Sequence, residues 1–191
     1  IGDVTLSRDV TFMPDEADRF IAAVDGATVG QTRTVGTPTT EPFRVYVRDR
    51  YGNPVPGEAV TFTVEKNNGS LSETLVVADE DGVAETTLTL GTESGENAVS
   101  WNAGWDDPRE DLMAIGEPDI PHTLHLLTDA TDLSAVAGGP GSISLEFEAW
   151  DAHGNVTGPA TIDFAGDGSF PGQAVVPAWA LGASPSVSID W

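Results

Sequence analysis

Carboxylates are the side chains of this sequence that could hold a metal ion, because the chain has three histidines and no cysteine. Asp49 with Asn53, and Asp79 with Asp81, stand in segments rich in turn-forming residues. A third group of acids lies between residues 105 and 120 and comprises Asp106, Asp107, Glu110 and Asp111. Calcium is bound by several such oxygens at once, so the sequence suggests calcium as a cofactor, chiefly at this third group. The competing interpretation is that these acids cap turns or face water, since no EF-hand loop is present.

Residues for catalysis or covalent modification are sparse. His122 and His125 are close in sequence, but without cysteine or a third ligand motif they do not indicate a zinc site. The sequence contains no nucleophile elbow, no HExxH motif and no phosphate-binding glycine loop. We therefore expect no enzyme activity and no catalytic residues. Asn68 and Asn155 each begin an acceptor sequence for N-glycosylation, a match that chance also produces.

Tryptophan side chains offer a different kind of chemistry, because an exposed indole can stack on a sugar ring. We expect Trp101 and Trp179 to pack inside, since they align with core positions of the repeat described below. Trp105 and Trp150 are the two that we expect to be exposed. A carbohydrate-binding accessory module is therefore the alternative function. The chain contains five tryptophans, namely Trp101, Trp105, Trp150, Trp179 and Trp191.

The net charge excludes other classes of protein. With 31 acidic and 8 basic residues the formal charge is −23, and Lys66 is the sole lysine. A nucleic acid would be repelled by this field, and no apolar stretch reaches the ~20 residues that a membrane helix needs. The acids are scattered, as on a strongly hydrated surface. Because the sequence starts at Ile1 rather than at methionine, we read it as a mature exported product or as an artificial boundary, and we expect an extracellular location.

Alternating apolar and polar residues predict an all-β chain. Residues 43–48 and 60–65 both show the period of two that half-buried strands have. The segment 47–53 returns as 149–155, and its Asp, Gly and Asn all shift by 102 residues (151 − 49 = 102). The chain is therefore interpreted as a tandem of two copies of one fold.

The repeated segment predicts a corner between two strands. An aspartate at a strand end can accept hydrogen bonds from the backbone N–H groups of the turn that follows. Glycine supplies the positive φ of such a turn, and asparagine tolerates it. The corner residues are Asp49, Gly52 and Asn53 in the first copy and Asp151, Gly154 and Asn155 in the second.

The first copy resembles a known family. Residues 45–57, followed by Val60-Thr61-Phe62, Asp81-Gly82-Val83-Ala84 and Leu88-Thr89-Leu90-Gly91, are similar to the bacterial immunoglobulin-like repeats of the invasin and intimin type. The resemblance covers about 20–104 well and 121–191 more weakly, because the second copy lacks the Asp-Gly-Val-Ala turn. It implies a Greek-key β-sandwich that serves as a rod segment of cell-surface proteins, without catalytic residues.

The expected architecture is two tandem immunoglobulin-like Greek-key β-sandwiches preceded by an extended strand. We place an N-terminal arm at 1–19, the first domain at 20–104, an acidic linker at 105–120 and a shortened second domain at 121–191. In the second domain Gly168 is followed closely by the sequence Phe170-Pro171-Gly172. The strand that matches residues 71–79 of the first copy is therefore expected to be missing, which would leave an open sheet edge.

The N-terminal arm could cover such an edge. Its apolar residues share one face of an extended segment and comprise Val4, Leu6, Val10 and Phe12. Donated to the second domain of a neighbouring molecule, this strand would form a head-to-tail contact that generates a filament. It could instead pair within its own chain or end a preceding domain of a longer rod. We thus expect a non-enzymatic extracellular structural protein, either a subunit of a surface filament that binds copies of itself or a stalk segment of an adhesin.

Overall fold

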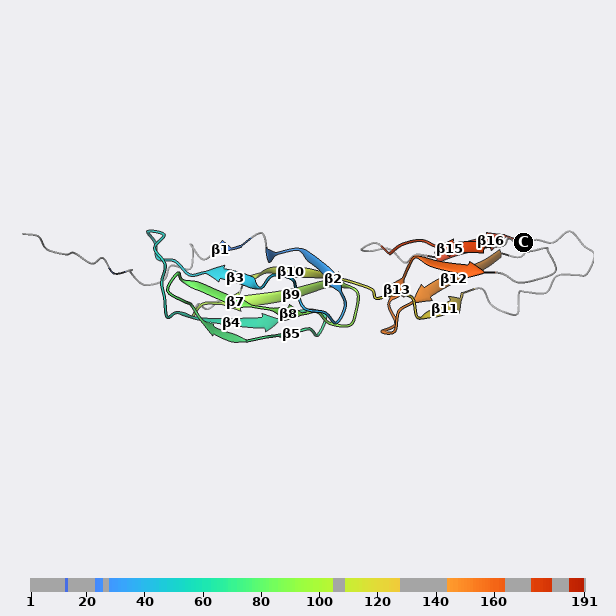
Figure 1. The fold of residues 1–191 in the computed structure, drawn as a ribbon. Helices are drawn as coiled ribbons and strands as arrows, with labels where there is room; N and C mark the ends of the chain where they lie inside the picture. The colour runs from blue at the N-terminus through green and yellow to red at the C-terminus, as the bar shows by residue number, and fades with distance from the viewer. Residues whose placement is uncertain are drawn as a thin grey trace, which may run out of the picture.

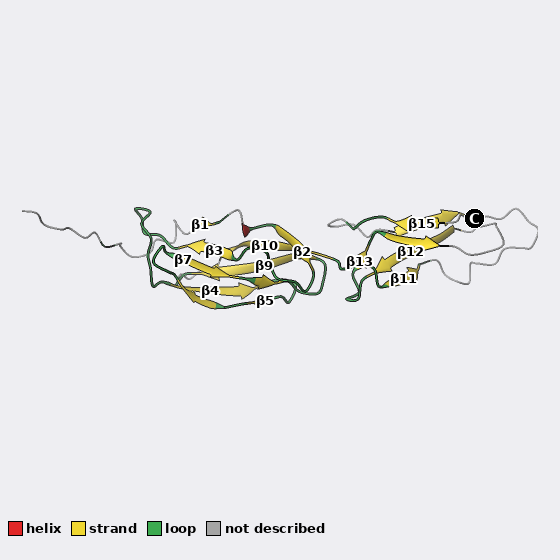
Figure 2. Cartoon of the chain, in the orientation of Figure 1, coloured by secondary structure: helices red, strands yellow, loops and turns green. Residues whose placement is uncertain are grey.

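The computed structural model describes residues 13, 23–25, 28–104, 109–127, 144–163, 173–179 and 186–190. All of its named elements are β-strands (Figure 2), which confirms the all-β prediction. Within these ranges no helix has the length and the apolar character needed to cross a membrane. The proposed donor residues Val4, Leu6, Val10 and Phe12 lie outside the described residues.

Two main sheets build the first domain (Figure 1). The smaller sheet has the order β1-β3-β7, with β1 at Ala23–Val24, β3 at Phe43–Tyr46 and β7 at Val83–Thr86. The larger sheet has the order β2-β10-β9-β4-β6, with β2 at Gln31–Thr34, β10 at Arg109–Glu117, β9 at Gly95–Asn102, β4 at Ala59–Val64 and β6 at Leu75–Val77. A short pair, β5 at Ser70–Leu71 and β8 at Leu88–Thr89, accompanies them.

The core of the first domain lies between these two sheets. The alternating pattern of β3 and β4 buries Phe43 and Val45 from one sheet and Val60 and Phe62 from the other. Trp101 of β9 packs into the same cluster with 1% of its surface exposed. A fully buried side chain of this size contributes about 1.5–3 kcal/mol by leaving water. The prediction that Trp101 packs inside is therefore confirmed.

Strand β10 differs from the sequence expectation, because it lies in the segment interpreted as an acidic linker. It pairs antiparallel with β9 and parallel with β2, and Leu112 and Ala114 join the buried core. The first domain thus extends to Glu117. Glu110 and Asp111, proposed as linker ligands for calcium, belong to this strand, whereas residues 105–108 lie outside the described residues.

The remaining strands form a second region, defined here as residues 119–190. Strand β12 pairs with β11, β13 and β16, and β14 pairs with β15. The pair Leu126↔Phe147 repeats the pair Val24↔Val45 with the shift of 102 residues that the sequence predicts. The bounds are β11 at Thr123–Leu126, β12 at Ser144–Trp150, β13 at Val156–Thr157, β14 at Ala160–Asp163, β15 at Gln173–Val176 and β16 at Ser186–Asp190.

Strand β15 occupies the place that the sequence analysis expected to be empty. Ile162 of β14 pairs with Ala174, as Val60 of β4 pairs with Val76 of β6. A Phe-Pro-Gly sequence therefore precedes the strand instead of replacing it. What the described residues of the second region lack is any strand in the places of β9 and β10, so β14 is paired on one side whereas β4 is paired on both.

Strand β16 corrects the expected alignment at the C-terminal end. It pairs with β12 as β7 pairs with β3, because the pair Leu145↔Ile189 stands where Phe43↔Thr86 stands in the first domain. An alignment of the two copies by their tryptophans would instead pair Trp191 with Trp101 of β9. Trp191 follows a strand that matches β7, so that alignment does not hold.

Candidate functional site

Both corners form the same hydrogen-bonded turn. In the first domain, Oδ1 of Asp49 accepts hydrogen bonds from the backbone N–H of Tyr51 and Asn53, both at 2.8 Å, and Oδ2 accepts one from Asn53 Nδ2 at 2.8 Å. In the second region, Asp151 accepts the corresponding bonds from His153 and Asn155 at 2.8–2.9 Å. Each turn contains a glycine with positive φ, +84° at Gly52 and +87° at Gly154, which is the conformation that glycine adopts without strain.

The second corner makes contacts beyond its own turn. Nδ2 of Asn155 donates a hydrogen bond to the carbonyl oxygen of Thr92 at 2.8 Å, and Oδ1 accepts one from the backbone N–H of Ser94 at 2.8 Å. One side-chain amide thus satisfies a backbone acceptor and a backbone donor of the first domain, as a neighbouring strand would do. Asn155 is consequently half-buried, whereas the equivalent Asn53 is exposed.

The loop that receives Asn155 is held by the first domain itself. Oδ1 of the buried Asn97 accepts a hydrogen bond from the N–H of Gly91 at 2.9 Å, and Asn67 Nδ2 donates to the carbonyl of Glu93 at 2.7 Å. Gly91 has no substitute here, since a Cβ atom would lie 1.5 Å from the carbonyl oxygen of Asn67. We call residues 91–95 the exit loop. Because its backbone is fixed by the first domain's own residues, little ordering is needed when Asn155 binds.

The connecting segment is bound to the second corner from two sides. The N–H of Asp119 donates to Oδ2 of Asp151 at 3.0 Å, and Thr157 Oγ1 donates to the carbonyl oxygen of Asp119 at 2.7 Å. A hollow of about 220 Å³ lies beside it, between Glu117 of the first domain and Trp179 of the second region. The set of residues that connects the two regions is called the joint and comprises Thr92, Ser94, Asp119, Asp151, Asn155 and Thr157.

Asp151 is the charged centre of the joint, with 3% of its surface exposed. Burial acts to raise the pKa of its carboxyl group. Hydrogen bonds from the side chain and backbone of Asn155, and from the N–H groups of Asp119 and His153, outweigh burial and hold the pKa below its ordinary value. The carboxylate therefore stays ionised and keeps accepting these bonds down to acidic pH.

The acids considered for calcium are used differently in the described residues. Oδ1 of Asp79 accepts hydrogen bonds from the N–H groups of Asp81 and Val83, both at 2.9 Å, so this carboxylate caps a turn as that of Asp49 does. Across the described ranges no group of three or more His, Cys, Asp or Glu side chains is placed to hold a metal ion. Calcium at Asp106, Asp107, Glu110 and Asp111 stays a prediction, because their side chains lie outside the description.

The two glycosylation sequons differ in their surroundings. Asn68 is exposed and adopts a positive φ of 50° in its turn. Nδ2 of Asn155 donates both to Thr92 and to Asp151. A glycan replaces one proton of that amide, so a modified Asn155 could not keep both bonds. Modification at either residue stays a prediction, but at Asn155 it would open the joint.

The tryptophans are not assembled into a common face within the described residues. Trp150 is half-buried, its ring lies 4.2 Å from that of His125 between centroids, and its Nε1 donates to Glu148 at 3.1 Å. Trp179 is half-buried, and Trp105 and Trp191 lie outside the description. Stacking by His125 leaves less of the Trp150 ring available to a sugar.

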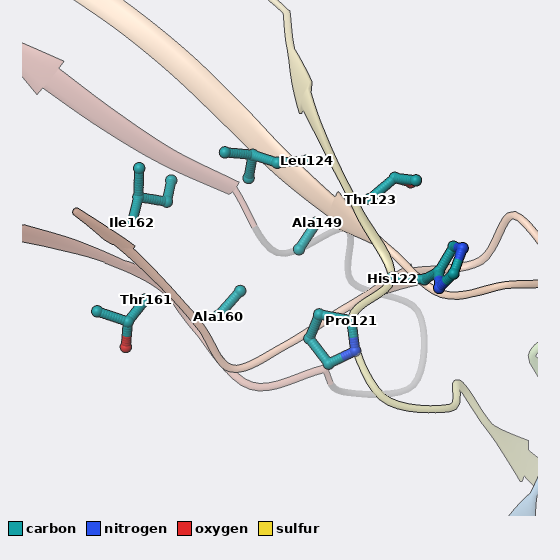
Figure 3. Close-up of a pocket in the computed structure, with 8 residues that line it drawn as sticks. All are labelled: Pro121, His122, Thr123, Leu124, Ala149, Ala160, Thr161 and Ile162. Atoms are coloured by element: carbon teal, nitrogen blue, oxygen red, sulfur yellow. The ribbon is translucent and has the colours of Figure 1, made fainter. Parts of the chain in front are cut away.

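A second feature of the region is an open hollow of about 180 Å³ between β11, β12 and β14. Figure 3 shows Ala149 and Ala160 pointing toward one another across it, with Ile162 and Leu124 alongside. Leu124 is 47% exposed. In the first domain the place of Ala149 is taken by Val47, which is fully buried in the core to which Trp101 belongs. Among the described residues, the smaller Ala149 thus stands where the first domain has a larger core side chain.

The sequence predicted both corners but did not reveal the exit loop that binds the second one. Thr92 and Ser94 act through backbone atoms, so their side chains carry no signal, and Thr157 is a single threonine in a strand. Of the exit loop, Gly91 was singled out from the sequence as part of the family resemblance. Which corner this loop meets depends on how the regions are placed, and sequence spacing does not give that placement.

Comparison with known proteins agrees with the architecture of the first domain. Residues 22–109 match the family described as bacterial Ig-like domain (group 1). The first domain belongs to this family. This bacterial Ig-like domain thus includes the first corner, both sheets and the start of β10. No curated protein sequence matches the chain.

Solved structures resemble the bacterial Ig-like domain and the second region together. The Escherichia coli adhesin FdeC superposes with a TM-score of 0.59 and 18% identity, over 94% of this chain and 56% of that one. This likeness shows the fold, and the chain spans little more than half of the FdeC structure. The Yersinia pseudotuberculosis adhesin InvE gives a TM-score of 0.42 and 18% identity over 88% and 49% of the two chains. Domains 5–6 of the S-layer protein SbsC give 0.37 and 21% over 92% and 84%.

Proposed function

We propose that the chain is a non-enzymatic structural protein of the cell surface, acting as a stalk segment of an adhesin or as a subunit of a surface filament. The observation that carries this proposal is the joint, in which Asn155 binds backbone atoms of Thr92 and Ser94. Such contacts fix the direction of the second region relative to the first domain, as is needed in a rod that must keep its shape under a pulling force. The acidic surface, with a net charge of −23, suits an extracellular position and keeps neighbouring rods apart.

The second region is part of the same proposal as a second immunoglobulin-like unit. Its strands β11, β12, β14, β15 and β16 repeat the pairings of β1, β3, β4, β6 and β7. The proposed division is an arm at 1–19, a first domain from about 20 to Glu117, and a second unit within 121–191. In the proposed filament a further strand lies beside β14, in the place that β9 has beside β4 in the first domain.

The N-terminal arm of a neighbouring copy is the proposed source of that strand. In the first domain β9 brings Val99 and Trp101, two residues apart, into the core beside β4. Val10 and Phe12 show the same spacing of a β-branched residue and an aromatic one. With Phe12 in the place of Trp101, the arm would fill the hollow next to Ile162 and pair with β14 on the side where β4 pairs with β9 in the first domain. Repeated from copy to copy, this contact makes a filament.

Donation can be tested by substitution on the two faces of the arm. Phe12→Asp would bury a charge in the second unit of the neighbour and should abolish assembly. Thr11→Asp, on the opposite face of the same strand, is the matched control and should leave assembly intact. Negative-stain microscopy and light scattering of both variants and of the wild type report the outcome. Filaments that persist with Phe12→Asp would contradict strand donation. A monomeric wild-type protein would contradict the filament role and would support the stalk role.

The alternative function, a carbohydrate-binding module, makes a separate prediction. A glycan array should then show binding that Trp105→Ala and Trp150→Ala each reduce. The contact of the Trp150 ring with His125 indicates that this ring packs within the protein. We therefore expect the wild-type protein to bind no glycan on the array.

A further inference from the structure

In the first corner Asn53 repeats the turn geometry of Asn155, but no described exit loop is bonded to its side chain. Asn53 and Asn155 bond to the preceding aspartate in the same way. Within the described residues, the side-chain hydrogen bonds of Asn53 stay inside its own turn, and its side chain is exposed. Asn155 adds two bonds to the exit loop. Within the described residues, the asparagine of the corner is thus bonded to an exit loop in one copy, whereas in the other copy, called the open corner, its side-chain bonds stay within the turn.

The open corner stands where a further module could reach it. Strand β3 runs toward the end of the first domain that lies away from the second region, and the corner follows β3 (Figure 1). Tyr51 at its tip is 72% exposed. The bound corner projects from the second region onto the first domain in the corresponding way.

The charge around the open corner indicates the nature of the partner. Arg48 precedes the corner and Arg50 lies within it, and they provide two of the chain's 8 basic residues. The corresponding positions of the second corner are Trp150 and Ala152, which carry no charge. The exit loop of the first domain carries an exposed acid, Glu93, between its two binding positions. A loop of this type fits a basic corner better than an uncharged one.

We propose that the Asn53 corner is a docking surface for the exit loop of another immunoglobulin-like module of the same kind. The side-chain amide of Asn53 donates to a carbonyl and accepts from an N–H two residues later, as Asn155 does with Thr92 and Ser94. In the docked pair, the acidic residue between the carbonyl and the N–H of the exit loop lies next to Arg50. The corner then acts as a repeated coupling that adds modules to a rod in one direction.

A duplication of the first domain provides the test. The test protein consists of residues 1–122, called the added copy, followed directly by residues 21–191, called the second copy. Asn53 of the second copy then lies 63 residues after Thr92 of the added copy, the same spacing that separates Asn155 from Thr92 in the natural chain. The first domain has a core made of its own residues, so the added copy brings a complete core. Amide hydrogen exchange of Ser94 in the added copy is measured by NMR with segmental labelling.

Docking should slow exchange at this Ser94 by about tenfold, the effect of one ordinary hydrogen bond. Asn53→Ala in the second copy should remove the protection, and Asn68→Ala, another exposed turn asparagine, should not. Arg50→Glu in the second copy should weaken the protection of the Ser94 amide. Combining it with Glu93→Arg in the added copy should restore that protection. Ser94 of the second copy, bound by Asn155, reports that the protein is folded. Equal exchange at the added Ser94 with and without Asn53→Ala would overturn the proposal, whether or not residues 1–12 assemble filaments.

Discussion

The first domain and the second region share a pattern of strand pairing but differ in the side chains that they bury. Both have matching strands up to β7 and β16, and both have the same corner. The first domain buries large side chains from β9 and β10, including Trp101 and Leu112. The second region buries only Ala149, Ile162 and Val176 among its described residues. The shared strands therefore set the shape, and in the first domain β9 and β10 add Val99, Trp101, Leu112 and Ala114 to the buried core.

This difference predicts where stability resides. Among the described residues, the second region has the smaller core, so we expect it to gain less from burial and to depend more on contacts with its neighbours. The joint is the contact that the described residues provide. We expect the first domain to unfold last and the second region to lose its structure when the joint is opened.

The largest effect is expected for truncation of the two tryptophans. Trp101→Ala removes a fully buried ring from the first core and should cost about 3–5 kcal/mol. Trp150→Ala removes a half-buried ring in the second region and should cost about 1 kcal/mol. Urea unfolding followed by far-UV circular dichroism measures both free energies. Equal losses would break the contrast between the two cores.

The next effect concerns the two corner asparagines. Asn155→Ala removes bonds to Thr92, Ser94 and Asp151 and should lower the stability of the second region by about 2 kcal/mol. Asn53→Ala removes the single bond to Asp49 and should cost the first domain about 1 kcal/mol or less. Region-resolved hydrogen exchange by mass spectrometry separates the two losses. The asymmetry of the corners would be refuted by a larger effect at Asn53.

Acid should affect the second corner through Asp151. Its pKa is lowered in the folded protein, so the unfolded chain binds the proton more readily. The stabilisation is complete above the ordinary aspartate pKa of about 3.9 and is lost as the pH falls through the lower folded value. NMR spectra between pH 5 and 2 should show joint signals shifting before those of the first core. In Asp151→Asn that dependence should be absent, and its persistence would assign it to another group.

The smallest effect is expected at the surface of the first domain. Lys66 Nζ lies 3.1 Å from Glu96 Oε1, and both side chains are largely exposed. Lys66→Met should change the free energy of unfolding by about 0.5 kcal/mol or less, and raising the salt concentration should change it little. A loss comparable with that of Trp101→Ala would mean that charge pairs, rather than the core, stabilise this domain.

The strands and corners could be predicted because their signals are local. Alternation located β3 and β4, and the sequence Asp-x-x-Gly-Asn located both turns. Strand β10 could not be found in this way, since its acidic start resembles a solvated linker and its pairing with β9 is a tertiary contact. Strand β15 was hidden by the Pro-Gly pair before it, which is a turn signal that also ends a loop.

The joint could not be predicted from the sequence for a different reason. Its acceptor and donor on the exit loop are backbone atoms, which every residue except proline has. What selects Thr92 and Ser94 is the conformation that Asn97 and Asn67 impose on the loop. The sequence repeat correctly related Asn53 to Asn155, but it could not show that one is bound and the other open.

Residual dipolar couplings of the whole chain test the central claim, that the Asn155 corner fixes the second region to the first domain. The account predicts that a single alignment tensor fits the amides of both regions in the wild-type protein. In Asn155→Ala each region should need a tensor of its own, while Asn53→Ala should keep the common one. Independent tensors in the wild type would contradict the claim, because the two regions would then move freely about the joint.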